Sequence, residues 1–185
     1  IDEVIIHEAN FSLLKGDLKR LSANTKSKFS TKKIKINNSN IFLKNNLSEI
    51  TAIIKISNAS LFFDEKKLLN LTDLKGQVFN IPFSLNYQHT LNSKKNKRIE
   101  IEANNLRLKM INESFKLDEN LTTGTNSILV LNSKINTKYN VLDKIIEFES
   151  SNSRMDNSKV NYNGRLAINP FDLDLKIDLD NYKIS

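Results

Sequence analysis

The residues Phe171-Asp172-Leu173-Asp174-Leu175-Lys176-Ile177-Asp178-Leu179 alternate between apolar and charged side chains at every position. Successive side chains of a β-strand point to opposite faces of a sheet, so this stretch predicts a strand with one apolar face and one charged face. The same alternation runs through Phe79–Tyr87, Ile99–Ala103 and Leu106–Met110, while helical spacing is scarce. The chain is therefore predicted to be all-β with little helix, most strands being antiparallel and joined in sequence order.

A ten-residue pattern repeats along the chain, because Ile34–Leu43 (IKINNSNIFL) aligns without gaps on Ile54–Phe63 (IKISNASLFF). Val4–Leu13 and Ile99–Leu108 fit the same template, in which small or polar residues separate two apolar pairs. The inner apolar residues are five positions apart, so an uninterrupted strand would place the two pairs on opposite faces. We therefore expect a tight hairpin or a β-bulge in each copy, with the same backbone conformation at 37–40 and 57–60.

A longer repeat links Gly76–Tyr87 with Gly164–Leu175, and the only two prolines of the chain, Pro82 and Pro170, fall at equivalent places in it. Proline cannot donate a hydrogen bond to a sheet, so each Pro-Phe pair predicts a strand start, an edge or a bulge. The preceding glycine predicts a turn or a close approach of neighbouring atoms. The simplest interpretation of both copies is a recurring element of the sheet without a ligand role.

Length and charge exclude several classes of protein. The 185 residues suit one continuous unit, and the 39% of apolar residues can cover one face of a sheet. The net charge of +7 would fit nucleic acid, but the lysines are scattered among Asn and Ile, so we expect no nucleic-acid partner. The densest basic run, Lys94–Arg98, is expected to be an exposed hairpin loop.

The residues that carry catalysis are sparse, and no enzyme is expected. His7 and His89 are the only histidines, neither lies near another metal-type ligand in sequence, and the glycines are too far apart for a phosphate-binding loop. Asp172, Asp174, Asp178 and Asp180 could form a row of cation ligands, but the interleaved Lys176 favours a solvated face. We therefore expect no catalytic residues, no metal ligands and no cofactor.

No signal peptide is recognised at the start of the sequence, and no stretch is long and apolar enough for a membrane-spanning helix. The chain begins with Ile1, inside an alternating pattern and without a methionine. We interpret residues 1–185 as a single β-repeat segment, a fragment of a longer protein whose anchor or export signal lies outside it.

The unit at Ile34–Leu43, its copy at Ile54–Phe63 and the Gly and Pro-Phe units at Gly76 and Gly164 resemble the AsmA-like proteins of diderm bacteria, whose relatives include TamB and YhdP. With the alternating strands, the resemblance covers most of the chain. It implies a periplasmic protein tethered to the inner membrane by a segment not present here. It also implies a curled sheet whose inside forms an elongated hydrophobic groove, and a non-catalytic role in phospholipid transport between the membranes and in outer-membrane biogenesis.

The partners implied by the resemblance are phospholipid acyl chains, for which a one-faced sheet would offer an apolar trough. The residues expected to line it are those of two apolar stripes: Phe79, Ile81, Phe83, Leu85, Tyr87, Phe171, Leu173, Leu175, Ile177 and Leu179. The alternative is a structural or adhesive β-repeat protein, in which these stripes meet across a closed core and no ligand binds. Exposure of Phe79, Phe83, Phe171 and Leu173 would distinguish the two hypotheses.

Overall fold

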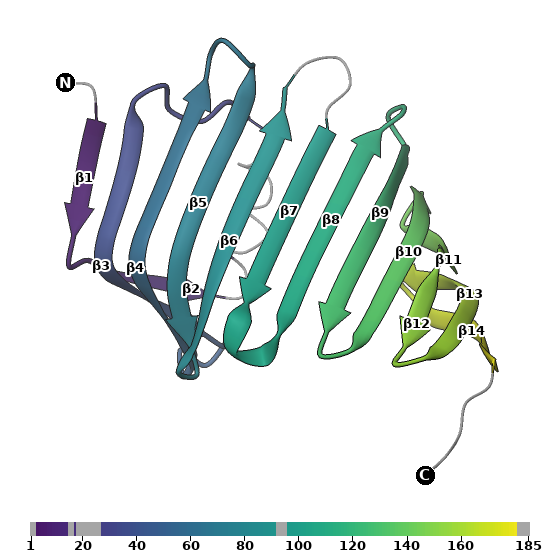
Figure 1. The fold of residues 1–185 in the computed structure, drawn as a ribbon. Coiled ribbons are helices and arrows are strands. Elements are labelled where there is room, and N and C mark those ends of the chain that lie inside the picture. The colour runs from purple at the N-terminus through teal and green to yellow at the C-terminus, as the bar shows by residue number, and fades with distance from the viewer. Residues whose placement is uncertain (1–2, 15–16, 18–26, 92–95, 181–185) are drawn as a thin grey trace.

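The computed structural model describes residues 3–14, 17, 27–91 and 96–180, and their strands form one 14-stranded sheet (Figure 1). The strands are β1 (Glu3–His7), β2 (Asn10–Leu14), β3 (Lys33–Lys44), β4 (Ile50–Asp64), β5 (Leu69–Val78), β6 (Ile81–Thr90), β7 (Asn96–Ala103), β8 (Leu108–Lys116), β9 (Leu121–Val130), β10 (Ser133–Leu142), β11 (Ile145–Ser150), β12 (Ser153–Met155), β13 (Ser158–Ile168) and β14 (Phe171–Asp180). A single 3-10 turn, η1 (Asn104–Leu106), joins β7 to β8.

Most of the sheet is an antiparallel meander, because the strands from β3 to β14 pair with their neighbours in chain order, β11 and β12 both lying between β10 and β13. The exception is one edge, where β1 and β2 run parallel to the first and second halves of β3. Figure 1 shows the sheet curling, with β11 to β14 turned away from the plane of β3 to β9. The prediction of an all-β, mostly antiparallel fold in sequence order is confirmed.

The strand register sorts side chains onto two faces. Leu74 of β5 lies opposite Leu85 of β6, which lies opposite Ile101 of β7. The row continues through Met110, Ile128 and Ile135 on β8 to β10. Cross-strand partners share a face and alternate residues lie on the same side. We call the face that carries this row the apolar face and the opposite one the polar face.

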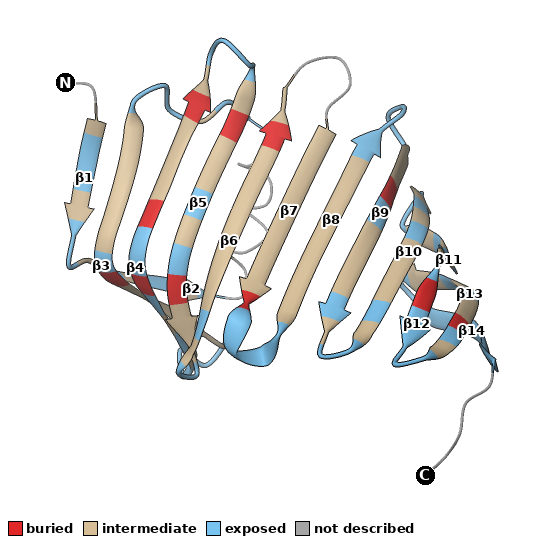
Figure 2. Ribbon diagram, viewed as in Figure 1, coloured by how far each residue is buried: buried red, intermediate tan, exposed pale blue. Residues whose placement is uncertain are grey.

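Few side chains of the sheet are fully buried, as Figure 2 shows by the scarcity of red. Among the described residues the buried hydrophobic side chains are Ile56, Ala59, Phe63, Ala103 and Val160. A sandwich or barrel of this size would bury a contiguous core between its layers. The described strands instead form a single layer, so most apolar side chains remain half-buried.

One bend of the sheet is built around Asn38 and Ser39. Asn38 takes a left-handed φ of 47° and Ser39 is only 1% exposed. The Ser39 hydroxyl accepts a hydrogen bond from the Ala9 amide at 3.0 Å and donates one to the Asn37 carbonyl at 2.8 Å. The hydroxyl thus gives a partner to the Ala9 amide, between β1 and β2, while the Asn37 carbonyl also accepts from the Glu8 amide.

A second bend uses the same pair of residue types. Asn152 has a φ of 59° between β11 and β12, and the following Ser153 is 2% exposed. Its hydroxyl accepts from the Asn136 amide at 2.8 Å and donates to the Asn136 carbonyl at 2.9 Å. An Asn-Ser pair with a left-handed Asn and a buried Ser therefore marks both bends.

The ten-residue template takes different forms in its copies. Val4–Leu13 contains the break between β1 and β2, Ile34–Leu43 and Ile54–Phe63 each contain an irregularity within a strand, and Ile99–Leu108 contains η1. In each strand copy both apolar pairs face the same side, as expected. The expectation of one shared conformation is wrong, because Asn38 has a positive φ and no residue of 57–60 does. The register shift of β4 against β5 lies between Ile56 and Asn58, and it accommodates the bend without left-handed backbone.

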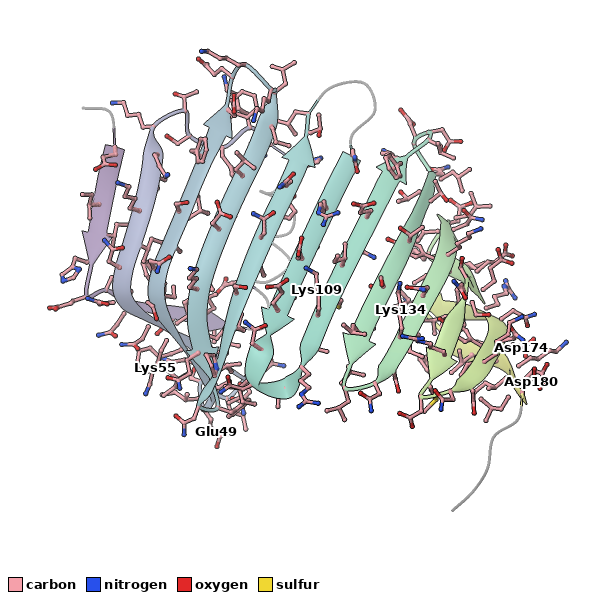
Figure 3. All side chains as sticks on the ribbon, in the orientation of Figure 1. Glu49, Lys55, Lys109, Lys134, Asp174 and Asp180 are labelled. Carbon is pink, nitrogen blue, oxygen red and sulfur yellow. The ribbon has the colours of Figure 1, made fainter. Side chains whose placement is uncertain are left out.

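The polar face carries a network of ion pairs on β7 and β8. Arg98 pairs with Glu100 at 2.8 Å and also with Glu113, while Lys109 pairs with Glu100 and Glu102, each at 2.6 Å. Figure 3 shows Lys109 in the middle of the sheet. Hydrogen bonds from Lys109 and Arg98 hold the pKa of Glu100 below its ordinary 4.5.

We predict that Ser39→Ala destabilises the fold by about 1–3 kcal/mol, because the partly buried Ala9 amide loses its acceptor. Urea unfolding followed by circular dichroism would measure the change, with the exposed Ser12→Ala on β2 as a control. Equal unfolding midpoints for the two variants would show that the hydroxyl is not needed at the bend.

The lowered pKa of Glu100 predicts a specific acid sensitivity. Its contribution to stability is fully present above pH 4.5 and is lost as pH falls through the lowered folded-state pKa. Glu100→Gln should therefore make the urea unfolding midpoint depend less on pH between pH 5 and the acid limit. Glu147→Gln, at an exposed position of the same face, should leave that slope of midpoint against pH unchanged. An unchanged slope in Glu100→Gln would contradict this assignment.

Candidate functional site

The apolar face is the candidate site, and its middle consists of apolar rows that cross the strands. The row of Leu74, Leu85, Ile101, Met110, Ile128 and Ile135 is followed by one of Gly76, Phe83, Ala103, Leu108 and Val130. Neighbouring strands lie about 4.8 Å apart, so the first row extends over roughly 24 Å. None of its side chains is buried, although each of its strands has a neighbour on both sides.

The predicted β6 stripe lies on this face with one exception. Ile81, Phe83, Leu85 and Tyr87 alternate along β6 and are half-buried. Phe79 does not belong to the strand, because it occupies the turn between β5 and β6, with a φ of 48° and 72% exposure. The apolar/polar alternation continues through the turn in the sequence, and this is why Phe79 resembled a strand residue.

The predicted β14 stripe also lies on the apolar face, because Leu175 is opposite Gly164 and Leu173 is opposite Leu166. All of its residues are exposed, and Phe171 reaches 76%. β14 has β13 as its neighbour, and β7 to β11 and β13 separate it from β6 in the sheet order. The two stripes therefore share one face but are not adjacent strands.

Polar side chains form a row above the apolar ones. Asn112 of β8 lies opposite Asn126 of β9, which lies opposite Thr137 of β10. Asn112 and the Tyr139 hydroxyl lie within hydrogen-bond distance at 3.0 Å, and Thr137 and the Tyr162 hydroxyl at 2.6 Å. The Oδ1 atom of Asn126 is buried without a hydrogen-bond partner. This row gives the face uncharged hydrogen-bonding groups next to an apolar surface.

One end of the face is covered by residues 27–30. Asn70 of β5, which is 0% exposed, accepts a hydrogen bond from the Phe29 amide at 2.9 Å and donates one to the Ser27 carbonyl at 2.7 Å. The Phe63 amide donates to the Ser30 carbonyl at 2.8 Å, and the Phe29 ring lies 6.5 Å from that of Tyr87. Asn70 therefore fixes this segment across the sheet, and no sequence signal distinguished it from the many other asparagines.

Glycines let aromatic rings lie against neighbouring strands of this face. A Cβ atom on Gly124 would lie 2.5 Å from Tyr139 Cζ, and one on Gly164 would lie 2.7 Å from Phe148 Cζ. A Cβ on Gly76 would lie 2.6 Å from the Lys55 carbonyl oxygen. The close approach predicted for Gly76 and Gly164 is confirmed, and Pro82 and Pro170 lie next to the starts of β6 and β14 as expected.

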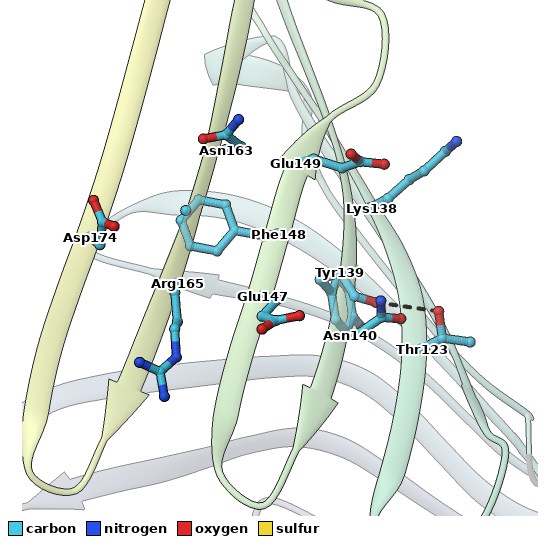
Figure 4. A pocket seen from close by; sticks show the side chains of 11 residues that line it. Thr123, Lys138, Tyr139, Asn140, Glu147, Phe148, Glu149, Asn163, Arg165 and Asp174 are labelled. Atoms are coloured by element: carbon cyan, nitrogen blue, oxygen red, sulfur yellow. Dashed lines mark hydrogen bonds between the residues drawn. The ribbon is translucent and has the colours of Figure 1, made fainter.

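A depression of about 530 Å³ lies over β9 to β14. Its lining is rich in charged side chains, among them Lys138, Glu147, Glu149, Arg165 and Asp174 (Figure 4). Alternation puts these five on the polar face, where the depression is open and shallow. The Thr123 hydroxyl bonds the Tyr139 carbonyl at 3.4 Å, so it is engaged with the backbone.

No group of three or more His, Cys, Asp or Glu among the described residues could hold a metal ion. Within the same residues, no helix has the length and apolar character to cross a membrane. His7 and His89 lie on different faces and strands, and the Asp residues of β14 are exposed on the polar face.

No family model, curated protein or solved structure matches this chain.

We predict that Asn70→Ala releases residues 27–29 from the sheet, because both side-chain bonds to that segment are lost. Amide hydrogen exchange of Phe29 should rise by at least tenfold, while exchange in β9 and β10 stays the same. Asn140→Ala, an exposed site on β10, serves as the control. Unchanged protection at Phe29 would show that other contacts hold the segment.

Proposed function

We propose that this chain is a non-catalytic groove protein that binds phospholipid acyl chains along its apolar face. The observation that carries this proposal is the incomplete burial of Leu85, Ile101 and Ile128, which lie on interior strands of the sheet. Exposed apolar area is unfavourable by about 25 cal/mol per Å², so such a row favours an apolar occupant. An acyl chain satisfies this need without any polar partner.

The proposed setting is the periplasm of a diderm bacterium, with the protein tethered to the inner membrane by a segment not present here. The proposed role is phospholipid transport between inner and outer membrane, and so outer-membrane biogenesis. Both rest on the resemblance of Ile34–Leu43, Ile54–Phe63 and the Gly and Pro-Phe units to AsmA-like proteins. A meander of repeated strands supports a role in phospholipid transport, because each added strand lengthens an apolar trough without changing its cross-section.

The structural or adhesive alternative is less well supported. A closed core would bury the β6 and β14 stripes against each other, whereas Phe171 and Leu173 are exposed and Phe83 is half-buried. Phe79 carries no weight in this comparison, because its exposure follows from its place in a turn.

Photocrosslinking tests the proposal directly. A benzophenone amino acid at Leu85 or Leu175 should crosslink to phospholipid in cells that express the full-length protein, because both positions lie on the apolar face. The matched controls are Ser84 and Lys176, which are adjacent on the same strands but face the other way. Equal labelling from both faces, or none from either, would contradict the proposal.

Aspartate variants separate a groove from a closed core. Leu85→Asp puts a charge in the path of acyl chains and should abolish lipid crosslinking. A half-exposed wall tolerates the charge better than a sealed core, so melting should fall only modestly, and Ser84→Asp should leave both readouts near wild type. A collapse of the melting temperature without any crosslinks in the wild type would favour the structural alternative.

A further inference from the structure

Exposed apolar side chains lie at the tips of four successive hairpins of the sheet. Alternate connections of an antiparallel meander lie at the same margin, and Figure 1 shows those of β5–β6, β7–β8 and β9–β10 along the lower margin. The tip residues are between 44% and 78% exposed. We call them the tip row: Leu47 between β3 and β4, Phe79 between β5 and β6, Leu106 in η1 and Leu131 between β9 and β10.

Two tip residues occupy positions where the backbone disfavours them. Phe79 and Leu131 each come first in a two-residue turn, with φ of 48° and 53°. Such positions favour Gly, Asn or Asp, because a bulky side chain is strained in left-handed backbone. The two-residue turn between β10 and β11, at the opposite margin, has Asp143 first with a φ of 46°. Turn formation therefore explains why Phe79 and Leu131 are exposed but not why they are apolar.

Hydrogen bonds fix the positions of the tips. The Leu131 amide donates to the Arg107 carbonyl at 3.2 Å, which joins the β9–β10 turn to the β7–β8 turn. In the β3–β4 turn, Asn45 Oδ1 accepts from the Leu47 and Glu49 amides, each at 2.9 Å. Successive hairpins are two strands apart, so the tips follow one another at about 9.6 Å and the row extends over roughly 29 Å along the sheet.

The two margins differ in how many charged residues their turns carry. Besides the tip row, the four turns at 45–49, 79–80, 104–107 and 131–132 consist of six asparagines, one serine, Glu49 and Arg107. The Glu49 carboxylate accepts from Asn45 Nδ2 at 2.7 Å. Leu68 and Leu117 are exposed at the opposite margin, but charged residues adjoin both. The described turns of that margin contain seven charged residues: Glu65, Lys66, Lys67, Asp118, Glu119, Asp143 and Lys144.

The connection between β6 and β7 also belongs to the opposite margin. Lys94–Arg98 was expected to be an exposed hairpin loop, but Asn96, Lys97 and Arg98 belong to β7. Lys94 and Lys95 lie outside the described residues. The comparison of the two margins therefore uses the other turns.

We propose that the tip row docks on a lipid bilayer, with its four side chains inserted between the head groups and the acyl chains. Separate projections about 9.6 Å apart do not form the contiguous surface that a protein interface needs, whereas a fluid bilayer closes around each one. The neighbouring asparagines can bond head groups, while Arg107 and Lys44, the last residue of β3, favour an anionic surface. Docking would place one margin of the apolar face against the bilayer, which goes beyond the proposed binding of acyl chains.

Tryptophan fluorescence tests the insertion, because the chain contains no tryptophan. Vesicles of phosphatidylcholine and phosphatidylglycerol with brominated acyl chains should shift the emission of Phe79→Trp and Leu131→Trp to shorter wavelength and quench it. Leu68→Trp is the matched control, since Leu68 is also an exposed leucine with left-handed backbone, a φ of 51°, but at the opposite margin. Its emission should change little.

Three results would overturn the inference. They are equal quenching at both margins, quenching at neither, and a shift of the Leu131→Trp emission with protein concentration in the absence of vesicles. The last result would identify the tip row as an interface between copies of this chain.

Asparagine substitutions separate docking from folding. The variant F79N/L131N places a residue that tolerates left-handed backbone in both turns, so its melting temperature should stay the same or rise. Its affinity for the vesicles in cosedimentation should nevertheless fall by about tenfold or more, because two inserted side chains are lost. The control L68N/L117N should keep the wild-type affinity. Wild-type affinity in F79N/L131N would contradict the inference.

One variant keeps this inference distinct from the proposed function. Leu85→Asp, on the apolar face, should leave the affinity for vesicles unchanged, because Leu85 lies within a strand and not at a tip. Vesicle binding by the tip row without lipid crosslinks from Leu85 would support docking and overturn the proposed function. Crosslinks from Leu85 without insertion of the tips would overturn docking alone.

Discussion

The extra residue at each bend keeps the apolar side chains on one face over the whole length of the sheet. A strand that bent without it would move its remaining apolar residues to the opposite face, because the side-chain period is two. Asn38 and Asn152, each with left-handed backbone, are the extra residues at the two bends. The hydroxyls of Ser39 and Ser153 then accept hydrogen bonds from backbone amides of neighbouring segments. The division of the sheet into an apolar face and a polar face depends on these bends.

As a consequence, apolar side chains lie mainly on one face of the sheet and charged side chains mainly on the other. The polar face is held by cross-strand ion pairs such as those of Lys109 with Glu100 and Glu102. The apolar face has few buried residues among those described, and its support comes from the backbone ladder, from Asn70 and from aromatic rings laid over glycines.

The same separation explains how one surface can suit an amphiphile. Apolar rows require no hydrogen-bond partner, and the Asn112 and Asn126 row offers polar groups without charge.

The sequence by itself determined the strands and their two faces, because strict alternation has a single structural meaning, and it required a bend or turn within each ten-residue unit. It did not determine which form each unit takes, since the left-handed backbone at Asn38 and the register shift at Ser57 depend on the neighbouring strands. Phe79 was assigned to a strand because alternation cannot show where a hairpin turns. The separation of β6 from β14 and the role of Asn70 were decided by tertiary structure alone, because register joins residues that no local pattern relates.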